Sequence, residues 1–336
     1  MNAMNPMIAH ADTRKDVEMR SYHIPSDTTG IELHIQNKRP RNIDTFDAAH
    51  TIVMMHGATY SSLSLYDTQV GGYSFMDYLA VRGYDVYAVD VRGYGRSTRP
   101  VEMDHPPEHS APLTNTEMAI RDFSSAMNFV LRTNGITQAN VIGMSWGGTV
   151  TGAYTTRNGH KVRRLGLIAP QWLSAAPIPL DSGGALAGYR IVQADAARTR
   201  WINAAPVHKR SDLIPHNGFE AWLAQTVGTE TDVAIKNAGA IRATNGPIQD
   251  IRDYWSAGRP FYDPSEIEVP VLLMHGEWDI DVPIDLALGY FKRLTGTPSK
   301  RWIEIGEATH MLVLEKNRQQ AFDALADFFI GSTQHS

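Results

Sequence analysis

Short apolar runs alternate with helix-like amphipathic segments along most of this chain. Runs such as Thr51 to Met55 and Ala139 to Met144 have the length and composition of buried strands. The segments between them have the length and apolar spacing of helices. This alternation predicts an α/β fold in which a mostly parallel, doubly wound sheet has helices on both faces. The strands expected are 51–55, 86–89, 139–144 and 165–169, and the helices are 73–82, 115–133 and 147–157.

The two ends of the chain add further elements to this sheet. Residues 17–24 and 31–38 alternate in the manner of strands and are separated by a turn-rich stretch, which predicts an antiparallel N-terminal edge. A strand beginning at Val271, a helix over 284–294 and a strand over 300–305 follow later in the chain. Residues 1–16 are polar and are expected to form a flexible tail.

The strand–helix alternation stops between Gln171 and Asp263. This stretch shows no clear strand pattern and predicts helices separated by Pro and Gly. Because it is inserted between two strands of the sheet, it should cover the carboxyl ends of the strands as a helical cap. The expected organisation is a tail over 1–16, an α/β core over 17–170 and 264–333, and a cap over 171–263.

One strand-to-helix junction carries the pattern G-x-S-x-G, with Ser145 at its centre. In such a turn the serine backbone is strained, so that its hydroxyl stands clear of the sheet. Gly143 and Gly147 are needed because a Cβ at either position would collide where strand and helix cross. The pentapeptide also occurs by chance, so its interpretation depends on whether a base and an acid accompany the serine.

Two polar residues at later strand ends are candidates for that base and acid. Asp279 comes just after the strand that begins at Val271, and His310 lies on the loop after the strand over 300–305. Open α/β sheets place their functional groups at such strand ends. With Ser145, these residues form a candidate Ser–Asp–His triad in the chain order typical of this junction.

Other residues compete for these roles. Asp281 and Asp285 are close enough to Asp279 to serve as the acid, and an aspartate before a helix is most often a helix cap. His275 is expected to be structural. His105 and His109 lie in an irregular Pro-rich loop over 102–113, but a metal site there is not expected.

The oxyanion formed by serine attack needs preorganised N–H donors. The backbone N–H of Trp146, directly after the serine, is one candidate. The second is expected from the loop after the strand over 51–55, where Gly57 leaves the N–H of Ala58 as the best candidate. Thr59 and Tyr60 are weaker side-chain candidates and are also expected to contact substrate.

With these motifs the chain resembles the α/β-hydrolase superfamily, as a capped, esterase-like serine member. The run D-x-R-G-x-G-x-S over 90–97 and the His56–Gly57 pair also match the superfamily pattern. Haloalkane dehalogenases and epoxide hydrolases of this superfamily carry Asp at the nucleophile position, where this chain has Ser145. The loop after the strand over 51–55 matches neither the H-G-G-P-G loop of proline iminopeptidases nor the H-G-G-G loop of lipases. The resemblance therefore leaves carboxylesterases, lactonases, thioesterases and carbon–carbon bond hydrolases.

Aromatic and cationic residues are dense in the expected cap. Each Trp there has an ordinary interpretation as cap core, but as a set they suggest an apolar acyl or alcohol pocket. A cap arginine could hold a substrate carboxylate, although solvated helix faces are the commoner location. The tentative substrate contacts in the cap are Trp172, Trp201, Trp222 and Trp255, and the arginines are Arg190, Arg198, Arg200 and Arg252.

Composition narrows the possible partners. The net charge of −5 shows no electrostatic footprint for nucleic acid, and no run of 18 apolar residues predicts a membrane span. The chain has no cysteine, which excludes disulfides, thiolate metal sites and a cysteine nucleophile. No cofactor or metal is expected, and a cytoplasmic location is the expectation because no signal-like segment begins the sequence. The oligomeric state is open, with a homodimer as one option.

The function expected is cleavage of a carboxylic ester, lactone or thioester of a small, partly apolar molecule through an acyl-enzyme. The first alternative keeps the triad but hydrolyses a carbon–carbon bond of a dienoic keto-acid. The second is a non-catalytic binding protein of the same fold.

Overall fold

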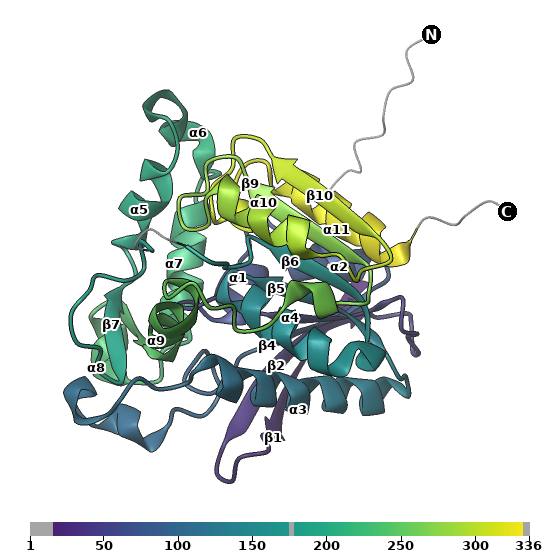
Figure 1. Ribbon diagram of the computed structural model, residues 1–336. Helices are drawn as coiled ribbons and strands as arrows, with labels where there is room; N and C mark the ends of the chain where they lie inside the picture. The colour runs from purple at the N-terminus through teal and green to yellow at the C-terminus, as the bar shows by residue number, and fades with distance from the viewer. Residues whose placement is uncertain (1–15, 175–177, 332–336) are drawn as a thin grey trace, which may run out of the picture.

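An eight-stranded sheet forms the centre of the protein, in the order β1-β2-β4-β3-β5-β6-β9-β10 (Figure 1). The computed structural model describes residues 16–174 and 178–331, so the tail predicted for 1–16 lies almost wholly outside the described residues. The strands of this sheet are β1 (Val17–Pro25), β2 (Glu32–Pro40), β3 (Thr51–Met55), β4 (Asp85–Val89), β5 (Ala139–Met144), β6 (Val162–Ile168), β9 (Val271–Gly276) and β10 (Lys300–Ile305).

The pairing of the strands confirms the predicted fold class. β2 pairs antiparallel with both β1 and β4, whereas the five pairings from β4 to β10 are parallel. The chain passes from β3 to β4 on one side and then crosses back to β5 on the other side of β3. The strand order therefore reverses at β3, and open α/β sheets bind their ligands at the carboxyl ends of the strands at such a point.

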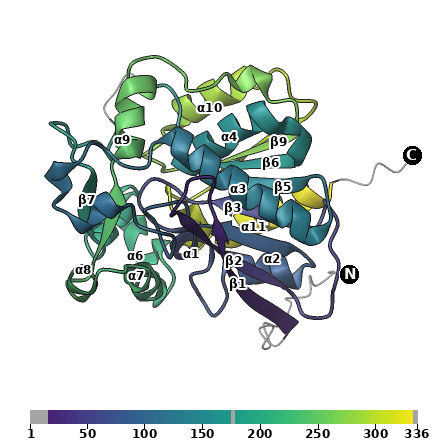
Figure 2. The same cartoon turned by 90° about the horizontal axis from the view of Figure 1, so that it is seen from below.

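Helices cover both faces of the sheet (Figure 2). Alternate strand residues face opposite sides: Val53 and Val141 pack with α3, α4 and α10, whereas Met54 and Ile142 pack with α2 and α11. The helices of the core are α1 (Ser62–Tyr66), α2 (Phe75–Val81), α3 (Thr116–Asn134), α4 (Trp146–Asn158), α10 (Ile284–Arg293) and α11 (Arg318–Ile330). None of the described helices is both long and apolar enough to cross a membrane.

Local capping explains where the longer helices begin and end. Asn115 accepts a hydrogen bond from the N–H of Met118 at the start of α3, and Gly135 ends this helix in the left-handed conformation at φ 64°. A capping box between Ser74 and Asp77 starts α2 two residues after the predicted position. The short helix α1, within the loop after β3, was not predicted.

The insertion between β6 and β9 contains strands as well as helices, so the prediction of a purely helical cap was wrong. β7 and β8 form an antiparallel pair in which Tyr189 lies opposite Thr244. The two strands are separated in the sequence by several helices, so their pairing depends on residues far apart in the chain and was not recognised. The elements of the insertion are β7 (Tyr189–Gln193), α5 (Ala197–Asn203), α6 (Arg210–Leu213), α7 (Gly218–Gly228), α8 (Val233–Asn237), β8 (Ala240–Thr244) and α9 (Gly246–Asp250).

We refer to residues 171–263 as the cap segment. In Figure 1 its helices α5 to α8 lie together beside one end of the sheet, and they are connected to the core through β6 and β9. The loop over 102–113, predicted to be irregular, contains only two short 3₁₀ turns, Val101–Asp104 and Pro107–His109.

Candidate active site

Ser145 lies on a strained turn between β5 and α4. Its backbone has φ 57° and ψ −121°, a conformation that non-glycine residues rarely adopt. A Cβ on Gly147 would lie 2.3 Å from the carbonyl oxygen of His56, and one on Gly143 would lie 2.3 Å from that of Gly147. Both contacts are with backbone atoms that cannot move aside, so the strand and the helix approach this closely only because both positions are glycine.

The loop after β3 lies directly against this turn. A Cβ on Gly57 would lie 3.4 Å from the Cβ of Ser145. The Ala58 carbonyl accepts hydrogen bonds from the Tyr94 hydroxyl at 2.9 Å and from the Arg190 guanidinium at 3.3 Å. Arg190 also donates to the Thr59 hydroxyl at 2.8 Å. This cap arginine, considered as a carboxylate ligand from the sequence, therefore holds the loop that contains Ala58.

His56 fixes the other end of the same loop. The N–H of Val91 must donate to the Nε2 of His56, 3.3 Å away, so Nε2 is the acceptor and Nδ1 carries the proton. The Nδ1–H then donates to the Gly57 carbonyl at 2.7 Å. Burial lowers the pKa of His56, in agreement with this neutral form.

Within the described part of the chain, the backbone N–H groups of Ala58 and Trp146 donate to no other residue. Ala58 lines the cavity described below, and Trp146 directly follows Ser145. The indole N–H of Trp146 is bonded to the Thr116 hydroxyl at 2.9 Å, which anchors the first turn of α4. Two free N–H groups therefore flank the serine turn.

His310 and Asp279 are hydrogen-bonded through Nδ1 and Oδ2 at 2.8 Å. The other oxygen of Asp279 accepts the N–H groups of Asp281 and Val282, each at 2.9 Å, so the carboxylate is fixed at both atoms. Asp279 is buried. The bond to Asp279 uses Nδ1 of His310 and leaves its Nε2 available. The His310 side chain lines the same cavity as Ser145.

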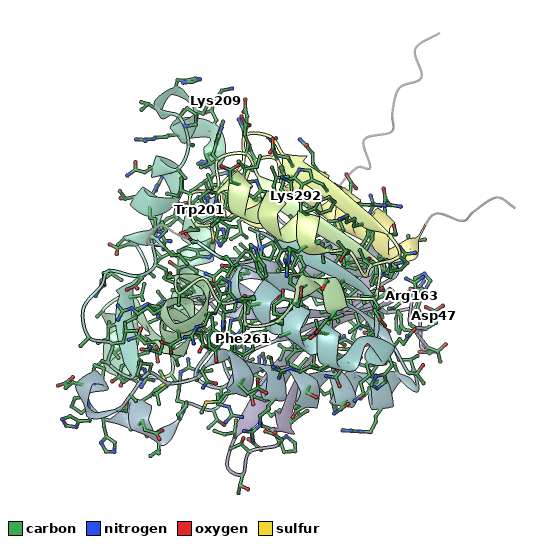
Figure 3. The ribbon with its side chains drawn as sticks, viewed as in Figure 1. Asp47, Arg163, Trp201, Lys209, Phe261 and Lys292 are labelled. Carbon is green, nitrogen blue, oxygen red and sulfur yellow. The ribbon has the colours of Figure 1, made fainter. Side chains whose placement is uncertain are left out.

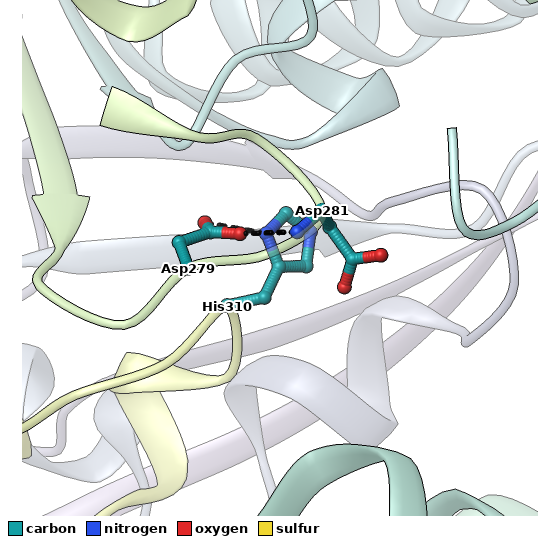
Figure 4. Close-up of side chains that lie close together, drawn as sticks. All are labelled: Asp279, Asp281 and His310. Atoms are coloured by element: carbon teal, nitrogen blue, oxygen red, sulfur yellow. Dashed lines mark hydrogen bonds and ion pairs between the residues drawn. The ribbon is translucent and has the colours of Figure 1, made fainter. Parts of the chain in front are cut away.

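A second carboxylate, that of Asp281, lies near His310. Figure 4 shows Asp279 and Asp281 on either side of the His310 ring, and ligand atoms of the three residues lie within 4.8 Å of one another. The guanidinium of Arg200, from α5, is paired with Asp281. Burial lowers the pKa of His310, but the charges of Asp279 and Asp281 and the bond to Asp279 outweigh it and raise the pKa to about 9.

The competing residues take structural positions. His275 is buried, and its Nε2 is 2.8 Å from the Val282 carbonyl, which places it behind the loop that carries Asp279. Asp285 lies in the first turn of α10, where a negative charge favours the helix. His105 and His109 are exposed, and the described residues contain only one group of three potential metal ligands, namely Asp279, Asp281 and His310. In this group His310 is hydrogen-bonded to Asp279, and Asp281 is paired with Arg200, so these side chains already have partners.

The D-x-R-G-x-G-x-S run over 90–97 forms the loop that follows β4. Asp90 accepts the backbone N–H groups of Ser62 and Arg96, and the Ser97 hydroxyl donates to the Asp90 carbonyl at 2.6 Å. Gly95 is required at φ 54°, since a Cβ there would lie 1.9 Å from the Asp90 carboxylate. This motif therefore has a structural role.

A largely apolar cavity joins the core and the cap segment at Ser145. It encloses about 830 Å³ of empty space, open solvent at its mouth included. The core contributes Ser145, His310, the loop after β3 and part of the apolar lining, and the cap segment contributes the rest of that lining with Arg200 and Gln171. Of the predicted substrate contacts, Thr59, Tyr60, Trp201 and Trp222 line this cavity.

Trp172 and Trp255, which were also predicted to contact substrate, do not line this cavity. Trp172 packs edge-on against Tyr290 with ring centroids 5.2 Å apart, and Trp255 packs near Phe261 at 6.0 Å. Both are buried in other parts of the protein. Four tryptophans in one segment have no periodicity that separates cavity-facing from core-facing positions.

Gln171 is a lining residue that the sequence reasoning missed. The residue is 4% exposed, and it lines the cavity beside Ser145. Its position directly after the end of β6 and Pro170 was the available signal, because polar residues at carboxyl ends of strands are often functional.

The sequence model of the α/β hydrolase fold family matches residues 50–317. The chain belongs to the α/β-hydrolase fold family. This match runs from the residue before β3 to the residue before α11 and includes Ser145, Asp279 and His310. No curated protein shows significant sequence similarity to the chain.

Solved structures share the fold of this α/β hydrolase at low identity. A serine hydrolase from the polyaromatic-hydrocarbon-degrading bacterium Cycloclasticus zankles is 16% identical with a TM-score of 0.62, covering 94% of this chain and 100% of its own. The 2-hydroxy-6-oxo-6-phenylhexa-2,4-dienoate hydrolase of a Rhodococcus strain is 17% identical with a TM-score of 0.58, covering 93% and 99%. A thermophilic esterase from Thermogutta terrifontis is 16% identical with a TM-score of 0.57, covering 92% and 97%.

Proposed function

We propose that this α/β hydrolase cleaves a carboxylic ester, or the related lactone or thioester, of a small and partly apolar molecule through an acyl-enzyme. The observation that carries this proposal is the hydrogen bond between His310 and Asp279 at the edge of a cavity that also holds Ser145. Ser145 is held in a strained backbone conformation, and such strained residues cluster at active sites.

In the proposed reaction the Oγ of Ser145 attacks the acyl carbon while the Nε2 of His310 takes its proton. Asp279 holds the His310 tautomer that leaves Nε2 free to accept. The oxyanion is bound by the N–H groups of Ala58 and Trp146. His310 then protonates the leaving alcohol or thiol, and water opens the acyl-enzyme by the reverse sequence, which restores the serine.

The lining of the cavity supports a substrate with an apolar portion. Trp201 and Trp222 pack edge-on at 5.8 Å between ring centroids, and Tyr60 packs edge-on against Trp222 at 4.8 Å. The aliphatic residues Leu65, Ile178 and Leu180 line the same cavity as these rings and add to its apolar wall. Such a wall favours acyl or alcohol groups that leave water on binding.

The position of Arg200 in the cavity lining favours a second candidate function, the hydrolysis of a carbon–carbon bond in a dienoic keto-acid. Arg200 could hold a substrate carboxylate. Its guanidinium is paired with Asp281, however, which reduces the attraction for an added anion. An ester is therefore the first candidate.

Covalent labelling with a fluorophosphonate tests the serine mechanism. Wild-type protein should react, and Ser145→Ala should lose both labelling and turnover, by on the order of 10⁴-fold or more, with its melting temperature nearly unchanged. Turnover of Ser145→Ala within about tenfold of wild type would exclude this nucleophile. Unlabelled wild-type protein would indicate a binding protein.

A substrate panel then separates the two reactions. p-Nitrophenyl esters, lactones and acyl-thioesters should be hydrolysed in preference to a ring-cleavage dienoate. A dienoate turned over faster than every ester would replace the ester proposal with the carbon–carbon bond hydrolase.

A further inference from the structure

One buried carboxylate connects the cap segment to the loop that carries His310. Glu315 has no exposed surface, and its oxygens accept three hydrogen bonds. The indole N–H of Trp201, on α5, donates to Oε1 at 2.5 Å. The N–H of Thr309 donates to Oε2 at 2.8 Å, and the Thr309 hydroxyl also donates to Oε1.

Thr309 directly precedes His310, so Glu315 holds the backbone from which the imidazole extends. Figure 3 shows Trp201 where the cap segment meets the C-terminal part of the core. We infer that Glu315 is a positioning residue that couples the seating of cap helix α5 to the placement of His310. This inference rests on the proposed function, in which the Nε2 of His310 accepts the serine proton.

The chemistry of Glu315 favours coupling over simple packing. Within the described part of the chain it has no cationic partner, and a buried carboxylate without a counter-ion is costly unless its donors stay in place. Burial raises the pKa of Glu315 to about 7, against the opposing effect of its hydrogen bonds. Movement of either Trp201 or Thr309 would therefore leave a buried acceptor unsatisfied, and the two groups are expected to hold each other in place.

The same helix also contacts the loop of the acid. Arg200, next to Trp201, is paired with Asp281, two residues after Asp279. α5 therefore contacts the loops of both His310 and Asp279, and it lines the cavity through Trp201 and Arg200. A substrate that presses on this wall can shift the geometry of the proton-transfer groups, since a displacement of about 1 Å can cost on the order of 100-fold in rate.

Glu307 offers a matched control on the same loop. It pairs with Lys209 of the cap segment at 2.5 Å and with Lys316, so it too joins the cap segment to the His310 loop. These pairs are partly exposed, and such pairs contribute little. Glu307→Gln should change kcat less than about threefold.

Glu315→Gln is the decisive variant, because it keeps the size of the side chain. The amide nitrogen of the introduced glutamine can only donate, but both Glu315 oxygens accept hydrogen bonds, from Thr309 and Trp201. One donor would therefore face another donor. With a small activated ester, kcat should fall about 10- to 100-fold while KM changes less than threefold. Trp201→Phe should lower kcat in the same direction, and in the double variant the two losses should not add, because both act on one contact.

The proton NMR resonance of the His310 Nδ1–H bonded to Asp279 gives a readout that needs no turnover. It should shift or broaden in Glu315→Gln and Trp201→Phe and stay unchanged in Glu307→Gln. An unchanged resonance and kcat in folded Glu315→Gln would overturn the inference, whatever the reaction proves to be. Should Glu315→Gln not fold, Trp201→Phe decides by the same resonance. Loss of turnover in Ser145→Ala without any effect of the Glu315 and Trp201 variants would leave the serine mechanism standing and this coupling refuted.

Discussion

Two carboxylates flank His310, but only Asp279 is hydrogen-bonded to it. Asp279→Asn should leave a folded protein whose turnover is lower by on the order of 10³- to 10⁴-fold, because the amide stabilises the wrong imidazole tautomer. Asp281→Asn should cost less than about tenfold, since that carboxylate acts on His310 through its charge alone. The initial rates of both variants, with melting temperatures as the control for folding, check this. The reverse ranking would make Asp281 the acid.

Asp281 and Arg200 should move the pH profile in opposite directions. The Asp281 charge raises the pKa of His310, whereas the Arg200 charge lowers it. In the proposed mechanism His310 must be neutral to accept the serine proton, so kcat/KM should rise with pH through the pKa of His310. The midpoint of this rise should lie above the ordinary imidazole pKa, up to about 9. The midpoint should move to lower pH in Asp281→Asn and to higher pH in Arg200→Ala. Profiles of kcat/KM for one ester measure both, and midpoints that shift the same way would contradict this electrostatic account.

At the scale of elements, the turn between β5 and α4 that carries Ser145, here called the elbow, requires glycine at positions 143 and 147. Gly147→Ala would place a Cβ 2.3 Å from the His56 carbonyl oxygen, so α4 or the loop after β3 must move. We expect a loss of about 1–3 kcal/mol or more in stability, with a larger proportional loss of activity. Gly159→Ala, at the C-terminal end of the same helix, meets no atom within 4 Å and should be neutral or slightly stabilising. Thermal unfolding of the two variants provides the comparison, and equal melting temperatures would show that the elbow tolerates the added methyl.

The elements that were predicted correctly are those with local signals. β10 was expected over 300–305 and forms over Lys300–Ile305, and α3 was expected within one residue of its observed ends. The elbow, the loop of Asp279 and the loop of His310 were recognised because each is a short turn at a strand end. β7 and β8 were missed because their pairing depends on residues far apart in the sequence.

At the scale of the whole molecule, prediction fails where packing between distant segments decides the outcome. Trp201 and Trp222 line the cavity whereas Trp172 and Trp255 do not, although all four lie in one aromatic-rich segment. Likewise, no local pattern connects Glu315 with Trp201, which are 114 residues apart in the chain. The sequence therefore indicated the candidate triad residues, and only the packed structure shows what surrounds them.

The cavity wall that the cap segment supplies should determine which esters are preferred. Trp222 and Trp255 form a matched pair, because both are almost fully buried and neither indole N–H has a partner in the described structure. Trp222→Phe and Trp255→Phe should therefore destabilise the protein to a similar degree. Only Trp222 lines the cavity, so only its replacement should reorder kcat/KM across an ester series, by about 1–3 kcal/mol in discrimination between acyl or alcohol groups. Reactivity toward a small fluorophosphonate should persist in both variants, since neither change touches Ser145. If Trp255→Phe reorders the series as much as Trp222→Phe does, preference is set by the stability of the cap segment and not by the wall of the cavity.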